Sequence, residues 1–456
     1  MRTTKAILAI ALCSAIVLTF AEGQEGFGFG EEGSDGAAPA ISAAGTGVKV
    51  GGSLEIGGSL FFDEMDDIGA VSLGDLYSTR LSIDATGSKV DASLRLKASK
   101  DIIELRPADI VDEARLRVSS GPLSFEGGLM KLTWGKADSQ GPLDVLNPLD
   151  LSDLTVTDSL ERKIARPMIH ASVAIGESSK AEAVFLPGFE GYRLATSGRW
   201  RPGQFDELDA TITYLVGMGA SWFGGVTYAS LLDAIDMSSL ADSQAGARFS
   251  TSFGSIDLGL QYFYGYLFTP AVKFMGTPLP STVELVYNRY HQIGADCAAV
   301  IAGFNARAEL AANLTEDLKG DAPSVYNPNL AFSLGFDRDL FAGVNLNLQY
   351  AGTYRLKDGE IDDSATSYDI EKGTDALSSA LTAVVTKSLF KDALDLKLTT
   401  IWEIDDEDFL LMPSVAYALG DAEIELSAGI FGGDEDGQMG QYADSSYVKA
   451  ALRYTF

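Results

Sequence analysis

The sequence is poor in cysteine. Of its two cysteines, Cys13 lies in an apolar stretch near the N-terminus and Cys297 lies far from it. If that stretch is removed, as argued below, a single thiol remains and no intramolecular disulfide can form. An exported chain of this length must then be stabilised by its fold alone.

Basic residues are also scarce. The chain has 34 Lys and Arg against 64 Asp and Glu, a formal net charge of −30. Such a balance repels polyanions, so nucleic acid and anionic lipid surfaces are poor partners. We therefore predict no nucleic-acid binding.

Long apolar runs are missing as well. The longest, Ala6–Phe20, follows two basic residues, precedes small residues and is too short for a spanning helix. We interpret residues 1–21 as a secretory signal peptide. A lipoprotein site at Cys13 is the disfavoured alternative, because Leu12 is too large for that cleavage context. With no transmembrane helix predicted, the membrane proteins left open are closed β-barrels, which span with short alternating strands.

Catalytic motifs are absent from the sequence. It has two histidines and no Gly-x-Ser-x-Gly, His-Glu-x-x-His or phosphate-binding Gly-rich loop. His170 alternates with apolar neighbours and is expected to face a lumen, where a Ser–His pair is the enzymatic alternative to a satisfied polar side chain. We predict no enzyme and no cofactor.

Calcium loops of regular spacing are absent too. The acidic clusters "DEMDD", "IDDED" and "GGDEDG" lack the D-x-D-x-D-G spacing. We predict that they keep loops soluble and form no metal site. Divalent cations bridging these loops to lipopolysaccharide are the alternative.

Residues 22–47 are rich in Gly, Ala and Glu and contain few apolar side chains that could be buried. We interpret them as a flexible segment, with a plug inside a barrel as the alternative.

From Val48 to Phe456 the dominant pattern is alternation of apolar and polar residues, which is typical of strands. It recurs clearly at residues 80–85, 90–97, 344–350, 394–399 and 423–428. A β-sandwich also alternates, but here very short connections alternate with long acidic ones, as in a membrane barrel. The predicted fold is all-β: a single transmembrane antiparallel β-barrel over residues 48–456 with about 20 strands (16–20), and no helix of ordinary length.

The final stretch, "SYVKAALRYTF", resembles the C-terminal strand of Gram-negative outer-membrane β-barrel (porin-like) proteins. The resemblance implies location in the outer membrane, contact with its lipid and lipopolysaccharide-type lipid, and recognition by the barrel-assembly machinery. The implied assembly signal is Leu452, Tyr454 and Phe456, facing lipid. "TWG" followed by "DVLNPLD" resembles, more weakly, a stretch of a poorly characterised porin-like family. Homo-oligomer formation is left open.

The longest interruption follows the fifth predicted strand, where general porins place a loop that narrows the lumen. We predict that residues 136–165 form such an inserted loop, because Leu143, Val145, Leu146, Leu149, Leu151 and Leu154 would be wasted on a solvated surface. A basic wall is expected on strands two to five, formed by Arg80, Arg95, Lys97, Arg115, Arg117 and Lys131. The opposing acids of the loop are Asp138, Asp144, Asp150 and Asp153. Together they predict a transverse field across a constriction; the alternative is that these charges merely solvate the lumen and pair locally.

Two finer expectations accompany this prediction. Lys131 joins the wall if Gly127–Gly128 forms a bulge that shifts the alternation. An aromatic girdle at the membrane interfaces is expected from Trp134, Trp222, Tyr228, Tyr262, Tyr264, Tyr350 and Trp402.

These features predict an outer-membrane channel for passive diffusion of small hydrophilic solutes through a constricted lumen. One alternative is a transporter of hydrophobic compounds with an N-terminal plug. Another is a non-transporting surface or adhesion barrel. The transported solute and the ion selectivity are left open.

Overall fold

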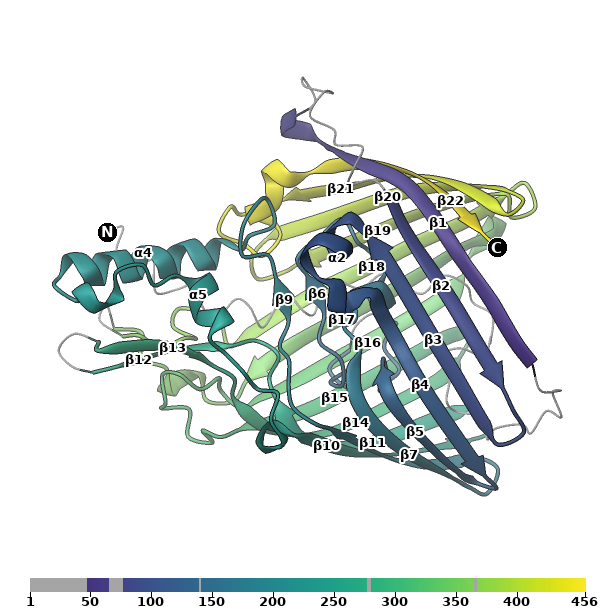
Figure 1. Cartoon of the computed structure of the whole chain (residues 1–456), viewed down its shortest axis with the longest axis horizontal. Coiled ribbons are helices and arrows are strands. Elements are labelled where there is room, and N and C mark those ends of the chain that lie inside the picture. The colour runs from purple at the N-terminus through teal and green to yellow at the C-terminus, as the bar shows by residue number, and fades with distance from the viewer. Residues whose placement is uncertain (1–46, 65–76, 139–140, 277–279, 365–366) are drawn as a thin grey trace.

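A computed structural model describes residues 47–64, 77–138, 141–276, 280–364 and 367–456. The predicted signal peptide at 1–21 and all but the last residue of the segment 22–47 lie outside the described residues. The dominant feature of the structure is one large curved sheet (Figure 1).

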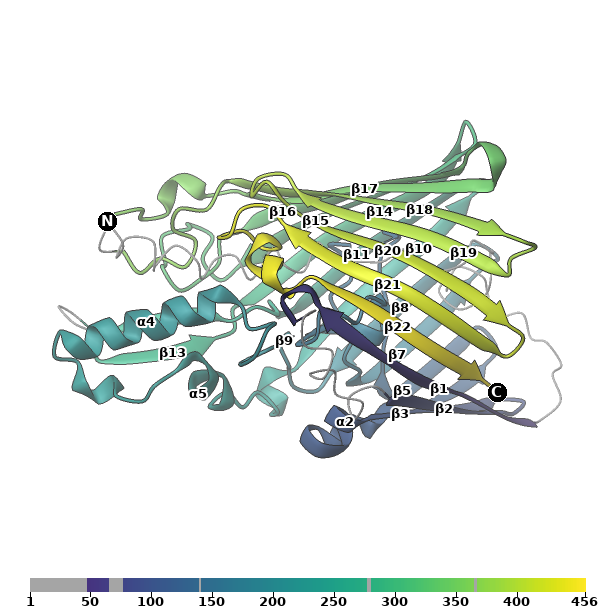
Figure 2. The ribbon, with the colours of Figure 1, turned by 90° about the horizontal axis from the view of Figure 1, so that it is seen from above.

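The large sheet is a closed antiparallel barrel of 18 strands in which neighbours along the chain pair with one another. The barrel strands are β1 Gly47–Phe61, β2 Tyr77–Thr86, β3 Val90–Ser99, β4 Val111–Ser120, β5 Leu123–Met130, β7 Arg166–Ile175, β8 Ser179–Leu186, β10 Gln244–Phe253, β11 Ile256–Tyr266, β14 Arg289–Ile301, β15 Phe304–Thr315, β16 Asn329–Asp339, β17 Val344–Arg355, β18 Leu377–Leu389, β19 Leu394–Glu403, β20 Asp408–Leu419, β21 Ala422–Gly432 and β22 Tyr447–Thr455. The first and last strands close the sheet by pairing from Ser53↔Thr455 to Phe61↔Tyr447, and they lie side by side in Figure 2. The predicted antiparallel barrel of 16–20 strands is confirmed.

Alternation along each strand separates the two faces of the sheet. On β16, Leu334 and Phe336 are 43% and 48% exposed on the outside, whereas Ser333 and Asp337 on either side of this pair are each 2% exposed. Successive side chains of a strand point to opposite faces, so this pattern makes the outer face apolar and the inner face polar.

The connections differ between the two rims. At one rim, called the short-turn rim, eight connections such as 87–89, 121–122 and 420–421 hold two to four residues. At the other, the long-loop rim, all connections but 404–407 are longer, and the longest run from 131 to 165 and from 187 to 243. The described chain starts and ends at the short-turn rim, since Gly47 pairs with Thr86.

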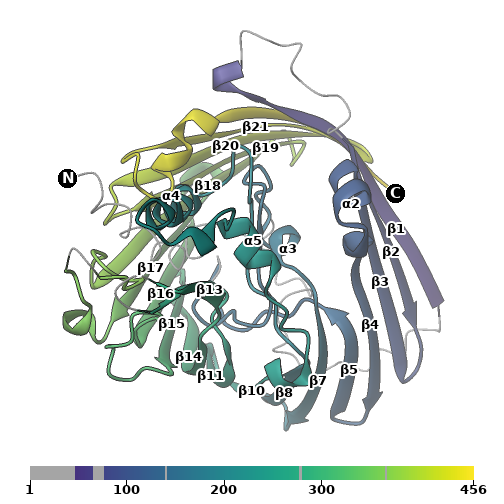
Figure 3. The same ribbon diagram turned by 60° about the vertical axis from the view of Figure 1, so that its left-hand side comes forward.

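The long-loop rim carries a cap built from residues 187–243 and the hairpin β12–β13 (Ala271–Met275 and Thr282–Val286), which project beyond the barrel in Figure 1. Helices α4 (Gly203–Gly217) and α5 (Tyr228–Asp233) lie over this rim in Figure 3. Phe205, Leu208, Ile212 and Leu215 of α4 are at most 3% exposed and pack on the hairpin. The expectation of no ordinary helix is wrong, because their spacing suits a 3.6-residue period.

The remaining elements are short. They are β6 Asp150–Leu151, β9 Arg193–Leu194, α2 Lys100–Leu105 and α3 Ser159–Arg162, with single 3-10 turns at Phe62–Glu64, Pro107–Ile110, Ser221–Phe223, Leu240–Asp242, Phe341–Gly343, Asp358–Glu360 and Gly440–Ser445. No helix among the described residues is both long and apolar enough to cross a membrane.

The irregularity in this part of the sheet differs from the predicted one, and Lys131 lies just beyond the end of β5. Pairing of β4 with β5 runs without interruption through Gly127 and Gly128. The register shifts instead between β3 and β4, where Arg95 pairs with Glu113 and Leu96 with Val111, which leaves Asp112 as the extra residue. The predicted bulge is therefore wrong in place, although Gly128 is still required: its φ is +144°, and a Cβ there would lie 2.0 Å from the carbonyl oxygen of Ala114.

Candidate functional site

The interior of the barrel holds the segment between β5 and β7, residues 131–165, which we call the lumenal insert. The six apolar residues of this segment that the sequence analysis singles out are between 0% and 8% exposed: Leu143, Val145, Leu146, Leu149, Leu151 and Leu154. This agrees with the docking that the sequence predicts, and burial of each such side chain contributes about 1.5–3 kcal/mol.

The lumenal insert contacts different parts of the wall in turn. Leu143 packs against Ala311 of β15 and Ala331 of β16. Leu146 lies in a cluster with residues of β5, β7, β8, β11 and β14. Leu149 belongs to a third cluster, formed with residues of β19 to β22. The insert therefore crosses the lumen and is anchored on well-separated stretches of the sheet.

Polar side chains on the inner face hold the insert backbone. Gln261 of β11 donates from Nε2 to the carbonyl oxygen of Leu143 at 2.9 Å, and Gln292 of β14 donates to that of Pro142 at 2.9 Å. Glu309 of β15 accepts from the backbone N–H of Ala137 at 2.7 Å and of Leu143 at 3.3 Å, and also from that of Lys136. These bonds satisfy backbone groups that would otherwise be buried without partners.

The predicted basic wall lies on the inner face of β2 to β5, and most of its charges pair with acids of the same strands. The pairs are Arg95–Asp84 at 2.8 Å, Lys97–Asp112 at 2.7 Å, Arg115–Glu126 at 3.5 Å, Arg117–Glu126 at 2.6 Å and Lys131–Asp112 at 2.9 Å. Arg80 instead reaches the insert, where it pairs with Glu161. A polar hollow of about 70 Å³ lies against this wall, lined in part by Arg115 and Arg117.

The four predicted acids of the insert have other partners. Asp138 pairs with Arg307 of β15, Asp144 with Lys163 at 2.7 Å, and Asp150 with Arg106 at 2.5 Å and Arg193 at 2.9 Å. Asp153 accepts the backbone N–H of Thr155 at 2.9 Å. Among the described residues, none of the four forms an ion pair with the basic wall.

Burial and pairing oppose each other at these carboxyls. Burial raises the pKa of Asp144 even though Lys163 opposes the rise, and it raises that of Asp138 against the effect of Arg307. At Asp150 burial is outweighed, because Arg193, Ser152 and Arg106 hold its pKa below the usual range. Asp150 is therefore the acid of this set whose charged form is most clearly favoured by its surroundings.

A network of charges links the insert to its neighbours. Arg193 of the cap donates to Asp150 of the insert and, at 2.7 Å, to Asp109 of the β3–β4 connection. Backbone pairing of β6 with β9 runs alongside these contacts. Nothing in the local sequence around Arg193 and Asp109 indicates that three separate loops meet there, so neither residue is predicted from the sequence.

The predicted lumenal histidine is satisfied by an acid. His170 is 3% exposed, and its Nε2 lies 3.1 Å from Oε1 of Glu182, which also pairs with Lys180. Among the described residues, no serine forms a hydrogen bond with His170.

The outer face agrees only in part with the predicted aromatic girdle. Tyr262 and Trp402 are 44% and 54% exposed on the outside of their strands. Trp134 lies inside the barrel at 4% exposure, and Trp222 and Tyr228 belong to the cap, so their assignment to the girdle is wrong.

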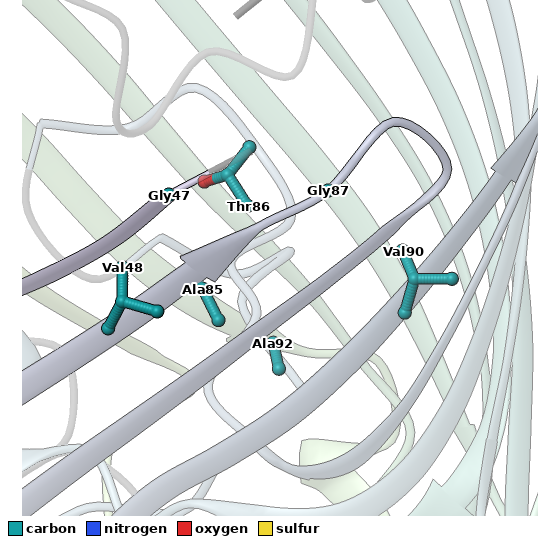
Figure 4. A pocket seen from close by; sticks show the side chains of 7 residues that line it. All are labelled: Gly47, Val48, Ala85, Thr86, Gly87, Val90 and Ala92. Atoms are coloured by element: carbon teal, nitrogen blue, oxygen red, sulfur yellow. The ribbon is translucent and has the colours of Figure 1, made fainter. Parts of the chain in front are cut away.

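The predicted assembly signal lies on the same outer face. Leu452, Tyr454 and Phe456 are 46%, 47% and 60% exposed. A hollow of about 480 Å³ opens at the short-turn rim nearby, between the ends of β1, β2 and β3, and Val48 and Ala85 line it with Val90 and Ala92 (Figure 4). Because these side chains belong to the apolar outer face, the hollow is no part of the lumen.

The sequence matches no family model and no curated protein. Among solved structures the chain resembles a loop-deletion mutant of OmpT, an outer-membrane protein of Vibrio cholerae, with a TM-score of 0.38 at 11% identity over 91% of this chain and 100% of that one. It also resembles a porin refined at 1.8 Å, with a TM-score of 0.38 and 10% identity, over 90% of this chain and 100% of the porin chain. The comparison with a triple mutant of Rhodopseudomonas blastica porin gives a TM-score of 0.38 and 11% identity, over 90% of this chain and 100% of the porin chain.

Scores of this size carry no argument about function. The strand pairing itself shows the architecture, and the predicted porin-like β-barrel is confirmed at the level of the fold by the closed sheet of 18 strands.

Proposed function

We propose that this protein is an outer-membrane channel through which small hydrophilic solutes diffuse passively, along a lumen narrowed by the lumenal insert. In this proposal the short-turn rim faces the periplasm and the long-loop rim faces the outside. The observation that carries it is the separation of an apolar outer face from a polar inner face around a closed sheet.

Three neighbouring strands illustrate that separation. Leu260, Ile293 and Leu310 are 62%, 57% and 52% exposed on the outside of β11, β14 and β15. Continuous apolar surface of this kind is unfavourable in water and favourable in lipid. The residues beside them, Gln261 and Gln292, turn inward, where hydrated groups are tolerated because a closed sheet leaves no unpaired edge in the lipid.

The polar character of the lumen favours hydrophilic over hydrophobic solutes. Asn347 and Gln349 face inward on β17, next to Arg307 and Asp337. The apolar inner positions are covered by Leu143 and its neighbours in the insert, so a lumenal pocket for a hydrophobic compound has little support. The proposal includes no enzymatic activity.

The expected partners follow from the same surfaces. We extend the proposal to outer-membrane lipid and lipopolysaccharide-type lipid against the outer face, and to the barrel-assembly machinery through Leu452, Tyr454 and Phe456. Homo-oligomer formation stays a prediction.

Planar-bilayer recording on the refolded full chain tests the proposal. We expect stable ohmic steps, which enlarge when residues 141–160 are replaced by a short Gly-Ser linker. Each sample is first checked for a folded barrel by its heat-dependent mobility on a gel. A folded chain without conductance would overturn the channel, and an unchanged step size in the folded replacement variant would overturn the narrowing.

A further inference from the structure

The ends of β19 and β20 at the long-loop rim carry buried acids that have no basic partner among the residues the structure describes. Glu403 and Asp408 pair directly across the two strands, and they are 3% and 0% exposed. The charged groups that act on Glu403 are Asp405, Asp406 and Asp408, all of them acidic. Uncompensated charges in such a position are costly, so a nearby positive group would stabilise these acids.

The β21–β22 connection, residues 433–446, closes over these acids. Oδ2 of Asp408 accepts from the backbone N–H of Met439 at 2.6 Å and of Gly440 at 3.1 Å. Gln438, 1% exposed, directs its Nε2 toward Oδ2 of Asp406 at 3.4 Å. Two acidic clusters of the sequence, "IDDED" and "GGDEDG", are thereby brought into contact.

Three buried oxygen atoms at this junction have no hydrogen-bond partner within the described part of the chain. They are Oε1 of Glu403, Oδ1 of Asp408 and Oε1 of Gln438. Buried polar atoms are nearly always satisfied, so three unsatisfied acceptors together indicate a missing donor or cation. The amide oxygen of Gln438 is an observation independent of the acidic cluster, because a neutral amide has no need of a counter-charge.

We propose that Glu403, Asp408 and Gln438 form a binding site for a divalent cation, with Ca²⁺ as the best match. Ca²⁺ accepts carboxylate and amide oxygens together in flexible geometry, whereas Mg²⁺ demands a near-ideal octahedron. Among the described residues no three His, Cys, Asp or Glu side chains are arranged to hold a metal. The site therefore depends on Gln438 as its third side-chain ligand, with water completing the shell.

A cation here joins the β19–β20 turn to the β21–β22 connection. Met439 and Tyr442 of that connection belong to the cluster that also contains Leu149 and Leu154 of the lumenal insert. Binding thus stabilises the wall on which one end of the insert rests. This role does not depend on whether the barrel conducts solutes.

Calorimetric titration of the refolded, EDTA-treated full chain with CaCl₂ tests the site. We expect one saturable site, and an at least tenfold weaker affinity in Glu403→Gln and in Gln438→Ala. The matched control is Glu177→Gln, which removes an exposed charge in the β7–β8 turn and is expected to bind as the unaltered chain does. Titration with MgCl₂ is expected to give weaker binding.

Gln438→Ala keeps every carboxylate, so it tests the site even if the Glu403 variant does not fold. Equal Ca²⁺ affinity in the unaltered chain and in Gln438→Ala would overturn the proposal, since binding would then be elsewhere. No saturable binding, combined with a Glu403→Gln variant that is more stable than the unaltered chain with or without Ca²⁺, would show that the acids hold protons instead.

Discussion

Glu309 on β15 accepts a hydrogen bond from the backbone N–H of Ala137 at 2.7 Å, across 172 residues of sequence. The same carboxylate also receives the N–H groups of Lys136 and Leu143. Three backbone N–H groups therefore depend on one buried side chain for their acceptor. Glu309 therefore fixes the start of the lumenal insert against the wall of the barrel.

Removal of this carboxylate is expected to free the insert. Glu309→Ala leaves three backbone N–H groups without their acceptor, at about 1–3 kcal/mol for each that stays buried. Glu309→Gln keeps one carbonyl acceptor and is expected to cost less. Amide hydrogen exchange at residues 136–143 checks this, with Glu177→Ala as the control. Unchanged protection in Glu309→Ala would show that the apolar contacts alone hold the insert.

Glycine is required where the insert approaches Glu309. A Cβ on Gly141 would lie 2.2 Å from Oε2 of Glu309, whereas a Cβ on Gly127 of β5 would meet no atom within 4 Å. We expect Gly141→Ala to destabilise the docked insert by about 1–3 kcal/mol through overpacking. The matched substitution Gly127→Ala is expected to be close to neutral. Proteolytic sensitivity of the insert and single-channel step size measure the effect, and equal behaviour of the two variants would contradict it.

The charge on Asp150 makes the stability of the loop network depend on pH. Burial opposes ionisation, but Arg193, Ser152 and Arg106 together lower the pKa of Asp150. A lowered pKa in the folded state means that stability is present above the ordinary value of 3.8 and is lost as the pH falls through the folded value. Asp150→Asn is expected to cost about 1–3 kcal/mol at pH 7, because charged hydrogen bonds are lost.

The difference between this variant and the unaltered chain is expected to shrink as the pH falls below 3.8. Denaturant unfolding in detergent at pH 7 and pH 3 measures both differences, with Glu360→Gln in the exposed β17–β18 connection as the control. A destabilisation that is equal at the two pH values would assign the effect to packing rather than to charge.

The sequence predicts the barrel well because alternation is a local property. Residues 394–399 alternate in the sequence and alternate between inside and outside in β19 for the same reason. The cap shows where this fails. Residues 211–216 are rich in β-branched and aromatic residues that favour strands, yet they form part of α4, because Ile212 and Leu215 gain burial against β12–β13. Tertiary packing decides such segments, and no local pattern reveals it.

In the candidate site, too, some features can be predicted from the local sequence and others depend on tertiary packing. The docking of the insert follows from its unusual apolar content, which the sequence displays directly. The partners of its charged residues cannot be predicted in this way. Asp144 forms an ion pair with Lys163 within the insert, whereas Asp138 forms one with Arg307 on β15. Such pairings depend on how far the insert reaches across the lumen. For Glu309, the sequence indicates only that the side chain faces inward from a strand. Many other residues share this property, so the contact with the insert cannot be predicted from it.

Glu207 of α4 is expected to give the cap the opposite pH dependence. Burial, reinforced by Asp436, raises the pKa of Glu207 to about 7. Its buried Oε2 has no hydrogen-bond partner among the described residues. A raised pKa means that stability is present below the ordinary value of 4.5 and is lost as the pH rises through about 7. Glu207→Gln is expected to match the unaltered chain at pH 4 and to be more stable at pH 8.

Hydrogen exchange in α4, followed from pH 4 to pH 8 in EDTA, measures this difference between the two chains. EDTA keeps any bound cation from contributing. The same pH profile in Glu207→Gln and in the unaltered chain would assign the dependence to another group, and Glu177→Gln serves as the charge-matched control.

Closure of the barrel depends on a glycine that faces the last residue. The backbone N–H of Gly52 in β1 donates to the backbone oxygen of Phe456 at 3.0 Å. The backbone N–H of Phe456 in turn donates to the carbonyl oxygen of Gly52 at 2.9 Å. A Cβ on Gly52 would lie 2.7 Å from Cζ of Phe456 and 2.6 Å from the carbonyl oxygen of Arg80 on β2. We expect Gly52→Ala to destabilise the folded barrel by about 1–3 kcal/mol, because β1 must move away from one neighbour or the other.

A double-mutant cycle separates the two contacts. In a Phe456→Ala background the ring is gone, so Gly52→Ala is expected to cost less there than in the unaltered chain, with the remainder due to Arg80. Unfolding monitored by heat-dependent gel mobility measures each variant, with Gly127→Ala as the control for a glycine in open space. Equal costs in both backgrounds would mean that the ring is not in contact with β1. A smaller cost in the Phe456→Ala background would establish that the outward-facing ring which ends the last strand also limits how closely the first strand can be packed.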